Sequence, residues 1–184
     1  MNDMIKNMLF ILGILLIFSS CSSGQGSKKE ALDYETLIKQ GQYFALNNQT
    51  DSAIIFFNRA VKVEGNRIEA YYGLGFSYSQ NCFNNRTDCN KAIEYFNKAE
   101  EIEPNFRRIY FNRALCKIKL LDYESAIDDL DKQILLDDSE ADYFKNRAGC
   151  KFLLNDTIGA CEDYRRSIEL GNTYEQAWVD RICN

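Results

Sequence analysis

A pattern of residues recurs along the chain at a fixed offset of 34 positions, and this repeat limits the possible folds more than any other feature. Residues 107–140 and residues 141–174 share eleven identical positions. In the first segment these are Asn112, Arg113, Ala114, Cys116, Lys117, Leu120, Asp122, Ala126, Asp129, Ile134 and Leu136. A period near 34 with two helical patterns per unit is typical of a helix-turn-helix solenoid. The sequence therefore predicts an all-α fold.

Two earlier segments fit the same frame. The four expected units are residues 34–67, 68–106, 107–140 and 141–174. The second unit is longer, and its polar stretch Gln80–Asn90 predicts an extended loop between its helices. Residues 175–184 are expected to form a cap that shields the last apolar surface of the array. The capping side chains are expected to be Ala177, Trp178 and Ile182.

The internal frame of these units resembles the tetratricopeptide repeat, in which aromatic and small residues occupy set positions. In the first two units the matching residues are Leu37, Gly41, Phe44, Ala53, Phe57, Ala60, Tyr71, Gly75, Tyr78, Ala92, Phe96, Ala99 and Pro104. The third and fourth units match at Tyr110, Ala114, Lys117, Ala126, Leu130, Phe144, Ala148, Lys151, Ala160 and Tyr164. The resemblance implies a right-handed solenoid of about four repeats with a C-terminal capping helix, spanning residues 31–184. It implies a protein-binding role without naming the partner.

The resemblance also implies a concave groove lined by the first helix of each unit. Position by position, the groove residues are Glu35, Ile38, Gln42, Ala45, Glu69, Tyr72, Phe76, Ser79, Arg108, Phe111, Leu115, Ile118, Asp142, Lys145, Gly149 and Phe152. The aromatic members, Tyr72, Phe76, Phe111 and Phe152, would form a strip able to anchor a peptide or helix. The alternative is that a domain swap, the tether or neighbouring helices cover these rings.

Some tetratricopeptide domains clamp the terminal carboxylate of a partner with Lys and Asn. Asn112 and Asn146 occupy one such position, but Ile38 and Gln42 stand where Lys and Asn are needed in the first unit. A carboxylate clamp is therefore not expected.

The amino-terminal residues 1–20 predict an export signal. The apolar run Met8–Phe18 would extend about 16 Å as a helix, roughly half the hydrocarbon thickness of a bilayer. Phe18-Ser19-Ser20-Cys21 resembles the lipobox of bacterial lipoproteins, which implies that Cys21 is lipidated and that the protein is held in the cell envelope, at the outer membrane because Ser22 follows. The alternative is an ordinary secretory signal cut near Ser20. Residues 21–30 read as a flexible tether.

Composition excludes several function classes. The net charge is −5, which provides no basic field for nucleic acid. The chain has no histidine, so the usual general base and the commonest zinc ligand are absent. The acidic run Asp128–Asp131 is interpreted as a solvated helix face and not as a metal site. We therefore expect no catalysis, no metal, no cofactor and no small-molecule substrate.

Six cysteines follow Cys21, in a compartment where disulfides persist. Cys82 and Cys89 flank the expected loop, and a bridge there would stabilise the fold by about 2.5 kcal/mol through the entropy of the unfolded chain. Cys161 and Cys183 are expected to tie the cap to the fourth unit, for about 3.4 kcal/mol in the same treatment. Cys116 and Cys150 occupy equivalent positions in adjacent units and are expected to be buried free thiols.

Two further patterns recur between units. Arg113 and Arg147, repeated together with Asp129 and Asp163, are expected to form ion pairs or caps between units. The tripeptides Asp51-Ser52-Ala53 and Asp156-Thr157-Ile158 resemble short bacterial O-glycosylation sites. Both fall at expected helix starts, and the favoured interpretation is that their aspartates are N-caps.

The sequence as a whole predicts an envelope-anchored scaffold for protein–protein interaction. One alternative is a pilotin-like escort for a secretion or pilus component. A different class is a thiol redox or metal–thiolate protein that uses Cys116 and Cys150.

Overall fold

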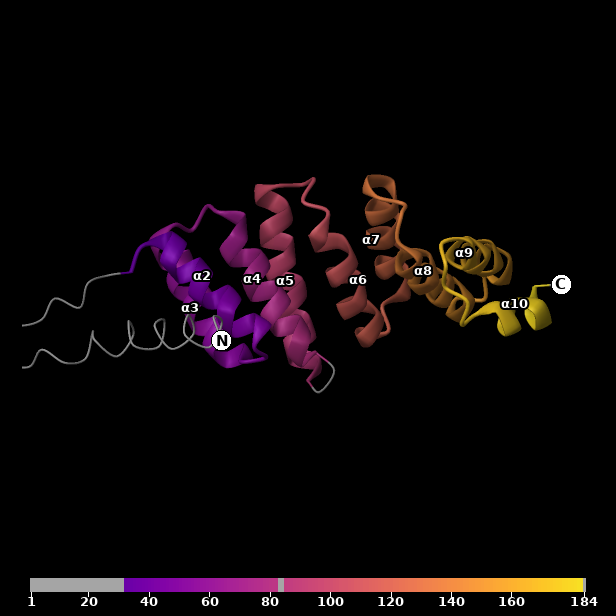
Figure 1. The fold of residues 1–184 in the computed structure, drawn as a ribbon, viewed down its shortest axis with the longest axis horizontal. Coiled ribbons are helices and arrows are strands. Elements are labelled where there is room, and N and C mark those ends of the chain that lie inside the picture. Colours follow the sequence, from indigo (N-terminus) through magenta and orange to yellow (C-terminus); the bar gives the residue numbers. More distant parts are fainter. Residues whose placement is uncertain (1–31, 83–84, 184) are drawn as a thin grey trace, which may run out of the picture. The chain divides into compact units, whose positions relative to one another are not determined.

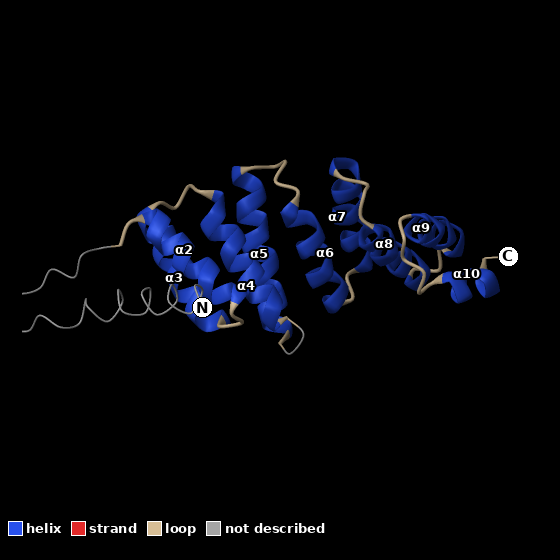
Figure 2. Ribbon diagram, in the orientation of Figure 1, coloured by secondary structure: helices blue, strands red, loops and turns tan. Residues whose placement is uncertain are grey.

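The computed structural model describes residues 32–82 and 85–183. The expected export signal, the lipidation site Cys21 and the tether lie outside the described residues. In the described part of the chain every regular element is a helix (Figure 2). The helices are α2 (Tyr34–Leu46), α3 (Thr50–Val63), α4 (Ile68–Asn81), α5 (Arg86–Ile102), α6 (Arg108–Leu120), α7 (Tyr123–Leu136), α8 (Ala141–Leu153), α9 (Thr157–Glu169) and α10 (Gln176–Ile182).

Each helix from α3 to α9 packs against the helix before it and the helix after it (Figure 1). The first helices of successive units also meet, because α2 contacts α4 and α4 contacts α6. This arrangement is a helix-turn-helix solenoid, which confirms the predicted fold class. None of the helices between residues 32 and 183 combines the length and apolarity needed to cross a membrane.

Phe57 joins the first two units through a close approach of three helices. Its ring is buried between Gly41 on α2 and Gly73 on α4. A Cβ atom added at Gly41 would lie 2.6 Å from the ring, and one added at Gly73 would lie 2.5 Å from it. Real side chains do not tolerate such distances, so both positions need glycine. Gly75 allows the same approach to Phe96 within the second unit.

The turn between the two helices recurs in three of the four units. Asn48, Leu121 and Asn155 stand at equivalent positions and have left-handed backbone, with φ of 56°, 67° and 66°. In each case the next N–H donates to a carbonyl oxygen five residues earlier, which closes the preceding helix. Leucine is a poor residue for this conformation, so Leu121 holds it at a cost of about 1–2 kcal/mol.

The helix starts confirm one of the two expected aspartate caps. The carboxylate of Asp156 accepts a hydrogen bond of 2.9 Å from the backbone N–H of Gly159 and caps α9. The prediction for Asp51 was wrong, because α3 begins one residue earlier, at Thr50, and Gln49 stands at the cap position. Asp51 therefore lies inside the first turn of the helix.

The prediction of an extended loop at Gln80–Asn90 was also wrong. Helix α4 continues to Asn81 and α5 begins at Arg86, so helix takes up most of the additional residues. The sulfur atoms of Cys82 and Cys89 are joined, with Cα atoms 4.6 Å apart. Both cysteines are buried beside Phe96, in the core of the second unit. The polar composition that suggested a loop instead belongs to the exposed side of a longer helix.

Of the three side chains expected to form the C-terminal cap, only Trp178 packs on the fourth unit. Ala177 and Ile182 are exposed, whereas Val179 is buried. Trp178 packs against the ring of Tyr164, at 4.7 Å between ring centroids. A disulfide joins Cys161 on α9 to Cys183 just after α10, with Cα atoms 5.6 Å apart. This pair and Cys82–Cys89 are the two pairs predicted from the sequence.

Candidate protein-binding face

The candidate face consists of the exposed sides of the four first helices, α2, α4, α6 and α8. At the end of this face that contains two glutamates, ion pairs join α2 to α4. The guanidinium of Arg67 pairs with Glu35 of α2 at 2.7 Å and with Glu69 of α4 at 3.0 Å, and the hydroxyl of Tyr34 donates to Glu69. Burial opposes the ionised form of Glu69, but a backbone hydrogen bond at Glu69 and the hydrogen bonds from Arg67 and Tyr34 prevail and lower the pKa of the carboxyl. These two expected groove residues are therefore engaged within the fold.

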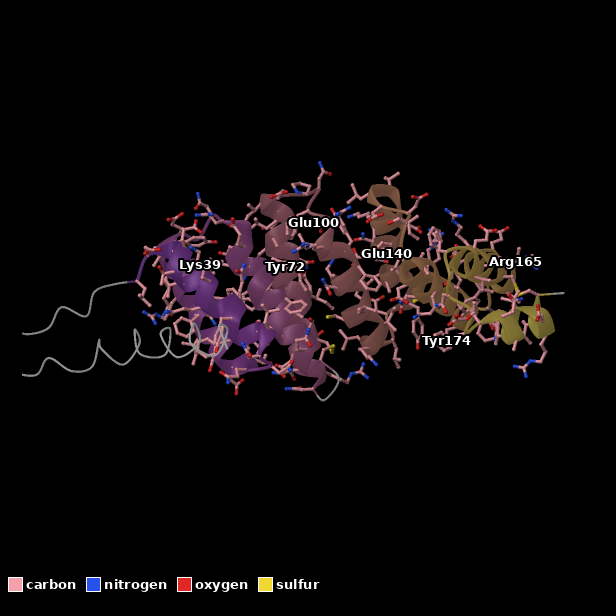
Figure 3. All side chains as sticks on the ribbon, viewed as in Figure 1. Lys39, Tyr72, Glu100, Glu140, Arg165 and Tyr174 are labelled. Carbon is pink, nitrogen blue, oxygen red and sulfur yellow. A yellow bond between two sulfur atoms is a disulfide. The ribbon has the colours of Figure 1, made fainter. Side chains whose placement is uncertain are left out.

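The rings of Tyr72 and Phe76 form the first aromatic cluster, with Tyr72 labelled on α4 in Figure 3. Their centroids are 6.2 Å apart, and Tyr72 also contacts Phe96 and Phe106, at 6.0 and 5.2 Å. The hydroxyl of Tyr72 accepts a 3.3 Å hydrogen bond from Asn112 of α6. Burial raises the pKa of the Tyr72 phenol. Tyr72 thus packs on the core of the second unit, and Phe76, also half-buried, lies beside it.

The expected aromatic strip is divided into separate clusters. Phe111 of α6 meets Tyr143 of α8 edge to face, with ring centroids 4.9 Å apart. Phe152 lies at the far end and contacts Trp178 of the cap at 5.0 Å, although 40% of Phe152 remains exposed. The alternative that neighbouring helices cover these rings therefore holds in part for Phe152.

The remaining expected groove residues divide by burial. Ile38 is 5% exposed and belongs to the core of the first unit, so its assignment to the groove was wrong. The resemblance to the repeat family assigned Ile38 to the groove, but in this chain the side chain packs in the core of the first unit. Gln42 is exposed and Leu115 is half-buried. Asp142 and Lys145 form an ion pair within α8.

A hollow of about 240 Å³ opens where α6, α7 and α8 converge. Its lining includes Arg108, Phe111, Asn112, Gln133, Glu140 and Tyr143. Glu140, at the start of α8, is labelled in Figure 3. Burial and the nearby carboxylates of Asp137 and Glu140 raise the pKa of Tyr143. Gln133 and Tyr143 were not predicted from the sequence. Gln133 could have been found, because it replaces the small residue that the frame places seven positions after Ala126.

Buried ion pairs connect the first helix α6 to the second helices α5 and α7. Arg113 donates two hydrogen bonds to the carboxylate of Asp129, at 2.9 and 2.6 Å, and a third to Glu100 of the preceding unit. The Lys117 ammonium lies 2.8 Å from the same Asp129 carboxylate. Asp129 is 1% exposed, so placing it on a solvated helix face was wrong. Burial opposes ionisation of Glu100, but hydrogen bonds from Arg113 and Lys132 lower its pKa to about 2.

The fourth unit repeats this arrangement nearer the solvent. Arg147 pairs with Asp163 at 2.6 Å and reaches back to Asp131 of the third unit. The side chain of Arg147 is 16% exposed, against 5% for Arg113. The arginine–aspartate pairs thus lie within a unit, and the arginines connect units through a second carboxylate. The expectation of pairing between units was correct only for that second contact.

The two free thiols lie away from solvent. Burial raises the pKa of Cys116 to about 12 and that of Cys150 to about 11. A reactive or metal-binding cysteine needs a lowered pKa, because the thiolate is the nucleophile and the ligand. Within residues 32–82 and 85–183, no group of three or more Cys, Asp or Glu side chains is placed to hold a metal ion.

Comparisons with known proteins agree with this architecture. The tetratricopeptide repeat family model matches residues 108–140, which contain α6 and α7. Residues 108–140 therefore form a tetratricopeptide repeat. An uncharacterized protein of Methanocaldococcus jannaschii is 42% identical over 60 residues, which cover 33% of this chain and 64% of that protein. The chain therefore matches less than two thirds of the length of this relative.

Solved structures of MamA share the tetratricopeptide fold. A crystal structure of MamA superposes with a TM-score of 0.71 at 18% identity, covering 82% of this chain and 84% of that one. MamA from Desulfovibrio magneticus RS-1 superposes with a TM-score of 0.70 at 20% identity, covering 80% of each chain. At this level of identity the likeness concerns the fold alone.

Proposed function

We propose that this tetratricopeptide repeat protein is an envelope-anchored scaffold that binds a protein partner through the face of its first helices and performs no chemistry of its own. The observation that supports the proposal most directly is the position of Phe76 and Phe111 on adjacent first helices, both half-buried. Each ring adjoins a second aromatic residue that supports it, Tyr72 and Tyr143 respectively. Aromatic anchors held in place by neighbours are the side chains that dominate binding energy at protein interfaces.

Crosslinking in intact cells followed by capture of the chain tests this proposal. We expect a partner that is captured by the wild type and lost with the double variant Phe76→Ser and Phe111→Ser. The matched control is Ile55→Ser on α3, which removes an exposed apolar side chain from a second helix. Equal capture by the wild type and the double variant would reject this face as the binding surface. Both variants should retain the helical circular dichroism of the wild type, because Phe76 and Phe111 are not fully buried.

Envelope anchoring rests on the sequence of the first residues, Met1 to Cys21. The variant Cys21→Ser tests it by fractionation and mass spectrometry. We expect the wild type in the membrane fraction with the added mass of lipid, and the variant in the soluble fraction or unprocessed. An unchanged mass and an unchanged membrane fraction for the variant would refute lipidation.

The raised pKa values of Cys116 and Cys150 argue against the thiol redox and metal–thiolate alternative. Burial of both thiols also withholds them from a redox partner. The scaffold proposal accounts for the same burial, since the two sulfurs occupy the space of small apolar side chains in the core.

A further inference from the structure

Helix α10 covers the C-terminal end of the array, beside α9 (Figure 1). It has seven residues, of which Val179 is buried and the other six are at least partly exposed. The Trp178 ring contacts Tyr164 of α9 and Phe152 of α8, at 4.7 and 5.0 Å between ring centroids. A helix shorter than about 12 residues is marginally stable by itself. The position of α10 therefore depends on what ties it to the fourth unit.

The polar contacts of α10 hold it only weakly. At its start, the Oε2 atom of Glu175 is closed off from solvent and has no hydrogen-bond partner in the described part of the chain. This carboxylate oxygen opposes docking, because water would bond to it if α10 moved away. At the other end, the guanidinium of Arg165, labelled in Figure 3, donates a 2.8 Å hydrogen bond to the carbonyl oxygen of Cys183. That bond is exposed, so water can replace it.

The disulfide between Cys161 and Cys183 is the covalent tie. Cys161 lies on α9, and Cys183 follows α10, 22 residues later. The bond keeps the end of α10 beside α9 even when the side chains of the cap separate from the fourth unit, so that the cap docks again from a high effective concentration. Without the bond, only the packing of Trp178 and Val179 would favour the docked position.

The two disulfides of the described chain differ in their access to solvent. Cys82 is 5% exposed and Cys89 is fully buried, and both belong to the core of the second unit. Cys161 is 6% exposed, but its partner Cys183 is partly exposed. Reduction begins when a thiolate attacks one sulfur of the bond, so access of the attacking thiol limits its rate. A dithiol should therefore open the bond at the cap before the bond in the second unit.

We propose that the Cys161–Cys183 disulfide is a redox-sensitive latch, whose reduction by a dithiol releases α10 and uncovers Phe152 and Tyr164. One thiolate of the dithiol attacks the sulfur of Cys183, which breaks the bond and frees the Cys161 thiol. The second thiolate of the dithiol then displaces Cys183 and closes the dithiol to a disulfide. Two electrons and two protons pass from the dithiol to the cysteine pair, which ends as two thiols.

The latch goes beyond the proposed scaffold function and does not depend on it. Phe152 is one of the residues expected on the candidate face, and Trp178 contacts it in the closed cap. Release of the cap would therefore enlarge the exposed aromatic surface at this end of the face. That consequence for binding rests on the proposed function.

The fluorescence of Trp178 tests the latch, because the chain contains one tryptophan. In the full chain, reduction with limiting dithiothreitol should shift the emission to longer wavelength and increase quenching by acrylamide, because the ring leaves Tyr164 and Phe152 for water. Cys183→Ser should show the same emission without reductant, and limiting dithiothreitol should then change it no further. Its helical circular dichroism should stay close to that of the wild type, since Cys183 lies after the last helix.

Arg165→Ala is the matched control, because it removes the hydrogen bond to Cys183 and leaves the disulfide in place. Its emission in the oxidised protein should equal that of the wild type. An equal shift in Arg165→Ala and Cys183→Ser would show that noncovalent contacts hold the cap, and it would overturn the proposal.

Alkylation of the partly reduced wild type, followed by peptide mapping, tests the order in which the two bonds open. Cys161 and Cys183 should be alkylated at dithiothreitol concentrations that leave Cys82–Cys89 intact. The proposal is wrong if Cys82–Cys89 opens first or together with the cap, or if the emission of Cys183→Ser equals that of the oxidised wild type. Neither result bears on the scaffold proposal, which is tested by capture of a partner through Phe76 and Phe111.

Discussion

Replacement of Arg113 by methionine should destabilise the protein more than the same change at Arg147. Arg113 is 5% exposed and holds Asp129, which is 2% exposed at its side chain, together with Glu100 of the preceding unit. Removing one partner of a buried ion pair typically costs about 3–5 kcal/mol, because a charge remains buried. Lys117 still faces Asp129 at 2.8 Å, so the lower end, about 3 kcal/mol, is expected.

Arg147→Met is the matched comparison, because the repeat places it at the equivalent position. Arg147 is 16% exposed, and its second partner, Asp131, is 54% exposed. Water can therefore replace part of the lost interaction, and a loss of about 1–2 kcal/mol is expected. The structure thus predicts unequal costs for two substitutions within the same sequence pattern.

Urea unfolding followed by far-ultraviolet circular dichroism, with the disulfides intact, measures both changes on one signal. The double variant Arg113→Met with Asp129→Leu should recover much of the loss, because it removes both buried charges. Equal losses for the two arginine variants would show that burial does not set the cost. No recovery in the double variant would show that the lost packing of Arg113, and not the stranded carboxylate, causes the destabilisation.

Three further predictions concern packing, pH and thiols. Gly73→Ala should destabilise by about 1–3 kcal/mol in urea unfolding, because the new methyl group would lie 2.5 Å from a buried ring, whereas Gly149→Ala, with its nearest contact at 3.7 Å, should not destabilise. Glu100 has a folded-state pKa of about 2 against an ordinary 4.5, so its contribution is fully present above about pH 4.5 and lost as the pH falls toward 2. Melting temperatures measured across this range should fall more steeply for the wild type than for Glu100→Gln, and parallel curves would contradict the assignment. Cys116 and Cys150 should react with DTNB at mildly alkaline pH only when urea unfolds the chain, and rapid labelling of the native protein would show that their burial is wrong.

The repeat made the fold predictable from the sequence, whereas the ends of individual helices and the loops between them were harder to predict. Identical residues at a 34-residue offset specify paired helices whatever the exact ends. The pairing of Cys82 with Cys89 was predicted correctly although Cys89 lies inside α5 and does not flank an extended loop. Composition misled at Gln80–Asn90, because polar residues on the exposed side of a long helix resemble a loop. At Asp51 the helix began one residue earlier than the capping preference suggested.

The binding face was predictable only in part, because a groove position and a core position can differ by a single residue on the same helix. Ile38 fell on the buried side. Asp129 was misplaced because the sequence suggests its pairing with Arg113 but does not show that the pair is buried. The hollow depends on three helices from two units, so no local pattern describes it. Comparing equivalent positions across units would nevertheless have singled out Gln133, where glutamine replaces alanine.

The four units close their internal turns by different means, and this difference makes the closure of one unit depend on the oxidation state of its cysteines. Three units use a left-handed residue, at Asn48, Leu121 and Asn155. At the equivalent position the second unit has Cys82, with φ of −56°, and its closure is the covalent link to Cys89. In a reducing compartment the second unit therefore lacks its disulfide, while the other three units keep their left-handed turn residues. A newly made chain would then lack the covalent closure of its second unit until oxidation forms the Cys82–Cys89 bond.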